Sequence, residues 1–134
     1  MIDLDYLKRS KEEIKNFIEL FRFLNEKTFN NLIIHMQKSM LFMVDSLAGR
    51  HVDLLTEYAY VKEKTYPYFG NEFFETYFLL SSINKKNIKF LTNEKIIVTG
   101  KKPYKLDTEY FKELAKTIIN YFNIIYSRVE NNGV

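Results

Sequence analysis

The chain has 134 residues, no cysteine, two prolines and a formal net charge of +3, with 46% hydrophobic and 28% charged residues. One domain of this length can bury a continuous core, and the apolar content is too high for an intrinsically disordered chain. Without cysteine, the chain has no disulfides, thiolate metal ligands or cysteine nucleophiles. It contains no apolar run of about 18 residues and no signal-peptide layout. We therefore expect a soluble cytoplasmic protein that neither spans nor binds a membrane.

The first half of the chain predicts two long helices. From about Asp5 to Asn25, apolar residues recur at spacings of three, four and seven, which places them on one face of a helix. A second and wider apolar stripe begins at Phe29 and ends before Gly49, a plausible helix-terminating glycine. Two further apolar residues of this second helix, Ile34 and Phe42, lie off its stripe, which suggests that it is covered on more than one side.

Two more helices follow. The third is expected from Val52 to Tyr66, because Pro67 disfavours a helical residue before it. The fourth is expected from Glu72 to Leu91, since its apolar residues again share one face.

Residues 92–106 are the one break in the helical pattern. We expect an ordered but irregular loop there, with at most a short extended piece at Ile96 to Thr99. Asp107 then resembles the N-cap of a closing amphipathic helix, whose tail from Glu130 should fray. The predicted fold is therefore all-α: a single domain over residues 1–134, with about five mostly antiparallel helices.

The positive charge is concentrated in one segment. Between Lys85 and Lys105 the chain carries seven lysines against a single acid, Glu94, while the rest of the chain is slightly acidic. Such a segment could bind a polyanion, although a solvated loop has the same composition. The candidate nucleic-acid or nucleotide ligands are Asn84, Lys85, Lys86, Lys89, Lys101, Lys102 and Lys105.

The residues give no sign of a catalytic, metal or cofactor site. His35 and His51 are the only histidines, and neither has a second ligand at helical spacing. No serine lies in a glycine-flanked elbow, and no glycine-rich phosphate loop is present. We therefore expect no catalytic residues, no metal and no cofactor.

Aromatic residues gather where the third and fourth helices meet. Nine tyrosines and phenylalanines fall between Tyr58 and Phe78. Most of them are expected in the core, because aromatic side chains bury a large area. A platform on which a nucleobase stacks is the functional alternative.

The order of these helices resembles that of HEPN domains, a family of small all-helical proteins. The likeness lies in the apolar second helix that ends in Met43-Val44-Asp45-Ser46-Leu47-Ala48-Gly49 and in the fourth helix with Tyr77-Phe78-Leu79-Leu80-Ser81-Ser82-Ile83-Asn84. Ribonucleases of the family carry an arginine and, four to six residues further on, a histidine in the fourth helix. The corresponding part of this chain offers Ser82, Asn84, Lys85 and Asn87 instead. The resemblance thus implies a non-catalytic, dimeric member that binds RNA, a nucleotide or a partner protein such as a nucleotidyltransferase.

Three functions remain open from the sequence. The first is a non-catalytic interaction module that forms a homodimer. The chain has more apolar side chains than a bundle of five helices can easily bury, and the extra ones are Ile34, Phe42, Phe78 and Leu79. The second is an RNA or nucleotide binder that uses the Lys85–Lys105 segment. The third is a ribonuclease-like enzyme with dispersed site residues. A polar pocket around His51, Glu57 or Glu63 would favour this third function.

Overall fold

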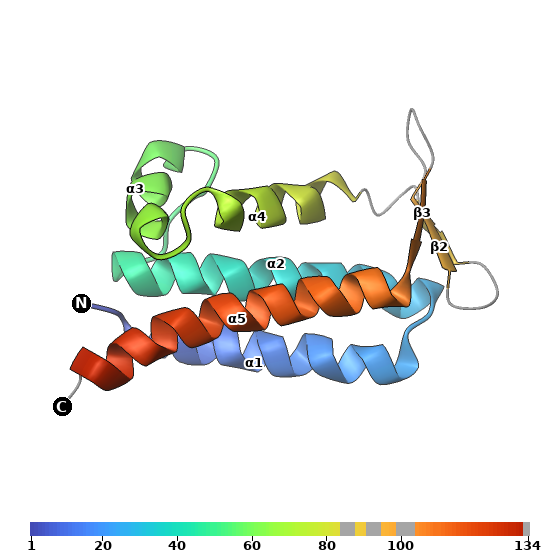
Figure 1. The fold of residues 1–134 in the computed structure, drawn as a ribbon, viewed down its shortest axis with the longest axis horizontal. Helices are drawn as coiled ribbons and strands as arrows, with labels where there is room; N and C mark the ends of the chain where they lie inside the picture. The colour runs from blue at the N-terminus through green and yellow to red at the C-terminus, as the bar shows by residue number, and fades with distance from the viewer. Residues whose placement is uncertain (84–87, 91–94, 99–103, 133–134) are drawn as a thin grey trace.

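The computed structural model describes residues 1–83, 88–90, 95–98 and 104–132, with side chains for residues 1–83 and 108–130. Its elements are α1 (Leu4–Leu20), the 3₁₀ turn η1 (Phe21–Phe23), α2 (Glu26–Ala48), α3 (Tyr58–Phe69), α4 (Glu72–Ser82), β1 (Ile88–Phe90), β2 (Lys95–Val98), β3 (Tyr104–Asp107) and α5 (Thr108–Asn132) (Figure 1). The predicted bundle of five helices is confirmed. No helix in these described ranges is both long and apolar enough to cross a membrane.

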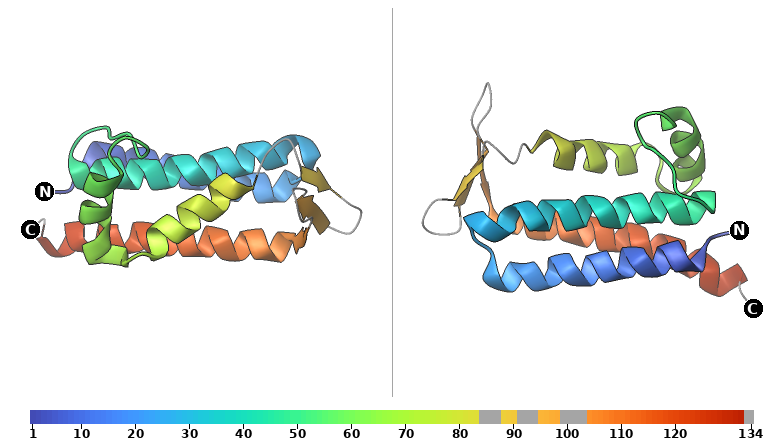
Figure 2. Two further views of the ribbon diagram at one scale, coloured as in Figure 1. Left: turned by 90° about the horizontal axis from the view of Figure 1, so that it is seen from above. Right: turned by 180° about the vertical axis from the view of Figure 1, so that it is seen from behind.

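Helix α2 forms the centre of the bundle and contacts all four other helices. Helices α1, α2 and α5 lie lengthwise, α4 lies across α2 and α5, and α3 closes one end (Figures 1 and 2). The strands lie at the opposite end. Ile34 and Phe42 are half-buried, so the prediction that α2 is covered on more than one side is confirmed.

The core is continuous and is built largely from aromatic and methionine side chains. Met36, Met40 and Met43 are fully buried along α2, as predicted for core methionines. Phe69 of α3 and Phe73 of α4 pack their rings against Tyr121 of α5, with centroids 4.9 and 5.4 Å away. These ring contacts hold the α3–α4 layer on the three long helices.

Local sequence explains where the two long N-terminal helices begin and end. Asp3 caps α1 by accepting hydrogen bonds from the Asp5 and Tyr6 amides. Asn25 and Thr28 form a capping box at the start of α2. Helix α2 ends at Gly49, whose φ of 75° is the left-handed conformation that glycine tolerates best, so this predicted end is confirmed.

Helix α3 differs from its prediction at both ends. It starts at Tyr58 rather than Val52, and it continues through Pro67 to Phe69. Pro67 removes one backbone hydrogen bond and its ring crowds the preceding turn, so it weakens the end of the helix, which stops two residues later. Gly70 then ends the helix, with a φ of 60° and its amide bonded to the Tyr66 carbonyl at 2.8 Å.

The segment expected to be one irregular loop instead carries strands. Helix α4 begins at Glu72 as predicted but ends at Ser82, not Leu91, and β1 follows. Strands β1, β2 and β3 form an antiparallel sheet in that order. The missed signal is the alternation of apolar residues with lysine in Ile88-Lys89-Phe90 and Tyr104-Lys105-Leu106, a period-two pattern.

Helix α5 follows β3 directly and runs the length of the bundle. It begins right after Asp107, the residue expected to precede it, and continues to Asn132. The helix thus includes residues 130–132, part of the tail that is expected to fray. Twenty-five residues at 1.5 Å each give a helix of about 37 Å.

A candidate ligand cavity at one end of the bundle

The predicted lysine site is described only in part. Asn84, Lys85, Lys86, Lys101 and Lys102 lie outside the described residues. Lys89 belongs to β1 and Lys105 to β3, and both pair in register with Ile97 of β2. The sheet therefore brings together two lysine positions that are far apart in the sequence.

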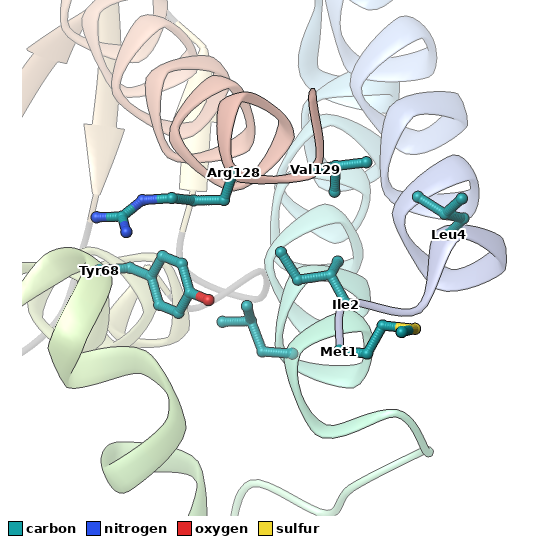
Figure 3. A pocket seen from close by; sticks show the side chains of 7 residues that line it. Met1, Ile2, Leu4, Tyr68, Arg128 and Val129 are labelled. Atoms are coloured by element: carbon teal, nitrogen blue, oxygen red, sulfur yellow. The ribbon is translucent and has the colours of Figure 1, made fainter. Parts of the chain in front are cut away.

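A different site is found at the other end, where α3 closes the bundle. Two adjoining cavities of about 480 and 360 Å³ open there and share Met1, Leu47, Tyr68 and Arg128. Both volumes lie in the range typical of small-molecule sites. The walls come from the N-terminal segment, the start of α1, and α2, α3 and α5, so the fold itself creates this site, which we call the end cavity (Figure 3).

The larger part of the end cavity has aliphatic walls and one charged group. Ile2, Leu4 and Val129 complete its lining with the four shared residues. The guanidinium of Arg128 lies over the Tyr68 ring, 5.5 Å from its centroid. Figure 3 shows these two side chains together on one side, with Leu4 on the other.

The smaller part of the end cavity is more polar. It adds Glu63, Lys64 and Pro67 of α3, so that two cations, Lys64 and Arg128, face one carboxylate. Among its described lining residues positive charge therefore prevails. An anionic group placed here would be attracted, while an apolar group would find its surroundings in the larger part.

Helix α3 presents a regular series of rings and cations toward this end. Tyr60, Lys64 and Tyr68 are spaced by four residues, so they follow one another along one face of the helix. The Lys64 ammonium and the Arg50 guanidinium both lie over the Tyr60 ring, at 5.6 and 4.9 Å. Sequence reasoning missed this series, although the four-residue spacing was available as a signal.

A second polar cluster anchors the loop after α2. The buried carboxylate of Asp45 accepts hydrogen bonds from the Val52 amide at 2.9 Å and pairs with Nδ1 of His51 at 3.1 Å. Arg50 pairs with Glu57 at 3.0 Å, and this hydrogen-bonded carboxylate raises the pKa of Arg50 above its ordinary value. His51 remains 76% exposed and lines none of the described cavities. The cluster therefore fixes the loop between α2 and α3.

The other histidine also has a partner from a distant segment. Nδ1 of His35 on α2 contacts Oε2 of Glu13 on α1, and both side chains are partly buried. This pair joins two neighbouring helices. Across the described residues no group of three or more His, Cys, Asp or Glu side chains could hold a metal ion.

The enzyme alternative predicts a polar pocket around His51, Glu57 or Glu63. Of these three, Glu63 lines the end cavity, and the other two do not. No protein-family model, curated protein or solved structure matches this chain. The resemblance to HEPN domains therefore stays a prediction, and the function has to be argued from the site.

Proposed function

We propose that the protein is a non-catalytic binding module and that its end cavity holds an anionic ligand with an apolar part. The observation that carries this proposal is that Arg128, whose guanidinium lies over the Tyr68 ring, lines both the aliphatic and the polar part of the cavity. Ligand sites are typically apolar pockets with a few polar groups that orient the ligand. The resemblance to HEPN domains fits the same proposal, because this chain lacks the arginine–histidine motif of the ribonucleases in that family.

An anionic dye tests this proposal directly. Anilinonaphthalene sulfonate combines an aromatic body with a sulfonate, so its fluorescence should rise on binding the end cavity. Arg128→Gln should weaken this binding by about tenfold, because one charge-assisted contact contributes about 1.5 kcal/mol.

The matched control is Arg9→Gln. Arg9 of α1 also lies over a tyrosine, 5.1 Å from the Tyr6 ring centroid, but it does not line the end cavity. Its replacement should leave dye binding unchanged. Equal losses in the two variants would show nonspecific attraction to surface arginines and would contradict the proposal.

A second candidate function is RNA or oligonucleotide binding by the Lys85–Lys105 segment. The observation that favours it is the sheet register, which sets Lys89 and Lys105 beside the same central position, Ile97. Because each phosphate contact releases counterions, the affinity for a single strand should fall with salt at a log–log slope of about −0.7 per contact.

Lysine replacement tests this second function. Changing Lys85, Lys86 and Lys89 to Gln should weaken oligonucleotide binding whatever the base sequence and should flatten the salt slope. The matched control changes Lys8, Lys11 and Lys15 of α1, three exposed lysines, to Gln. Absence of binding at low salt would refute this second function.

A further inference from the structure

The lining of the end cavity narrows the chemical class of its ligand. In the larger part, Ile2, Leu4, Leu47 and Val129 present branched aliphatic side chains, and Met1 adds an unbranched one. Such walls suit a flexible alkyl chain, which can adapt to an irregular apolar surface without polar contacts.

A nucleobase fits this lining poorly. Bases bind by stacking on a free ring face and by hydrogen bonds to their polar edges. Among the described residues that line the end cavity, Tyr68 has the only aromatic ring, and the guanidinium of Arg128 already lies over one face of it. The lining side chains of both described parts also include no Asn, Gln, Ser or Thr to read a base edge.

The charges set the direction in which a ligand would lie. Arg128 lines both parts of the end cavity, and Lys64 is found only in the smaller part. An anionic head group at Arg128 would therefore leave its apolar tail toward Leu4 and Val129, on the side away from Tyr68 (Figure 3). Glu63 also lines the smaller part, and its negative charge disfavours ligands with several negative charges.

We infer that the end cavity binds a free aliphatic carboxylic acid, with its alkyl chain between Leu4, Leu47 and Val129 and its carboxylate at Arg128. This inference rests on the proposed function, since it names the class of anion that the cavity accepts. The larger part alone, at about 480 Å³, is of the size found for small-molecule sites.

A chain-length series provides the test. Hexanoate, octanoate, decanoate and dodecanoate are titrated calorimetrically into the whole protein below their micelle-forming concentrations. Each added CH₂ that becomes buried should tighten binding by about fourfold, until the cavity is full. Arg128→Gln should weaken decanoate by about tenfold but leave the neutral decanol nearly unchanged.

Three further arms separate the possible outcomes. Arg9→Gln, the matched arginine control, should bind decanoate like the parent protein. If adenosine monophosphate binds in an Arg128-dependent way and the carboxylates do not, the inference is overturned while the proposed function stands. If the carboxylates, adenosine monophosphate and the anionic dye all fail to bind, both the inference and the proposed function are overturned. Binding only to vesicles that contain decanoate, and not to the free acid, would also overturn the inference.

Discussion

At the scale of single residues, the most unusual feature is a carboxylate buried at the end of α2. Asp45 is 1% exposed, and its carboxylate accepts a hydrogen bond from the Val52 amide and also pairs with the His51 ring. A buried acid is tolerated only when its oxygens are satisfied by hydrogen bonds. Asp45 therefore holds the loop that leads from α2 to α3, and with it the position of α3 against the bundle.

Replacing this acid should cost stability. Asp45→Ala leaves the buried Val52 amide without its acceptor, so we expect a loss of about 1–3 kcal/mol in the free energy of unfolding, measured with urea. The matched control is Asp53→Ala, because Asp53 accepts the Leu55 amide at 2.9 Å but is exposed. Its loss should stay below about 1 kcal/mol. Equal costs would contradict the role given to burial.

Tyr121 should make the free energy of unfolding fall as the pH becomes alkaline. Burial is the main cause that raises its pKa from 10.0 to about 12, and its hydroxyl lies 2.9 Å from that of Thr76 on α4. The folded protein thus favours the neutral phenol. The resulting stabilisation is complete below pH 10 and is lost as the pH rises toward 12.

Urea unfolding between pH 10 and pH 12 tests this dependence. Tyr121→Phe should lower stability at neutral pH by about 1 kcal/mol, through the lost hydrogen bond to Thr76. It should also flatten the alkaline decline, because the buried ionisable group is gone. Tyr126→Phe, at an exposed tyrosine of the same helix, should keep the full decline. An unchanged decline in Tyr121→Phe would refute the assignment.

At the scale of elements, the helices were more predictable from sequence than the strands. Helix α2 shows why: its apolar stripe and Gly49 at its end both favour the bounds that the structure shows. Helix α3 has a weaker signal, and its start depends on the loop held by Asp45, a contact that spacing does not reveal. The three strands have three or four residues each, too short for their alternation to stand out.

The contribution of the α2 capping box to the free energy of unfolding should be measurable. The Asn25 side chain accepts the Lys27 amide at 2.8 Å, and the Thr28 hydroxyl accepts the Asn25 amide at 2.9 Å. Asn25→Ala should therefore cost about 1 kcal/mol in thermal or urea unfolding. Asn31→Ala, at an exposed position inside the same helix, should be neutral or slightly stabilising. A similar cost at both positions would exclude a capping contribution.

At the scale of the whole molecule, the two candidate sites lie at opposite ends. The sheet precedes α5, and Arg128 lies twenty residues after Thr108, which corresponds to about 30 Å along this helix. A small ligand cannot touch both. The end cavity could not be predicted from sequence, because its walls come from Leu4, Leu47, Tyr68 and Arg128, four positions that only the tertiary fold brings together.

The homodimer stays a prediction, and the structure indicates where to test it. Phe78 of α4 is 42% exposed and lies beside Tyr58, which is 43% exposed, with ring centroids 6.2 Å apart. Such an apolar patch is typical of an interface between copies of a protein. Ile34, Phe42 and Leu79, which also suggested a dimer, are half-buried within the chain itself.

Light scattering at micromolar concentration should give twice the chain mass of 16.1 kDa. Phe78→Glu should return the protein to that single mass, because a charge would be buried in the contact. Phe23→Glu is the matched control, since Phe23 is 68% exposed in η1, outside the α3–α4 layer. A single-chain mass for the parent protein would refute the dimer.

The assembly of the end cavity from four segments has a consequence for local opening of the fold. Helix α3 has only 12 residues, contains Pro67 and begins without a side-chain cap, so it should unfold locally before the longer helices do. A ligand in the end cavity would lie against residues of both helices, Tyr68 of α3 and Arg128 of α5, and would disfavour that opening. The amide protons of α3 should then exchange with solvent more slowly as ligand is added, by the factor one plus the ligand concentration over its dissociation constant.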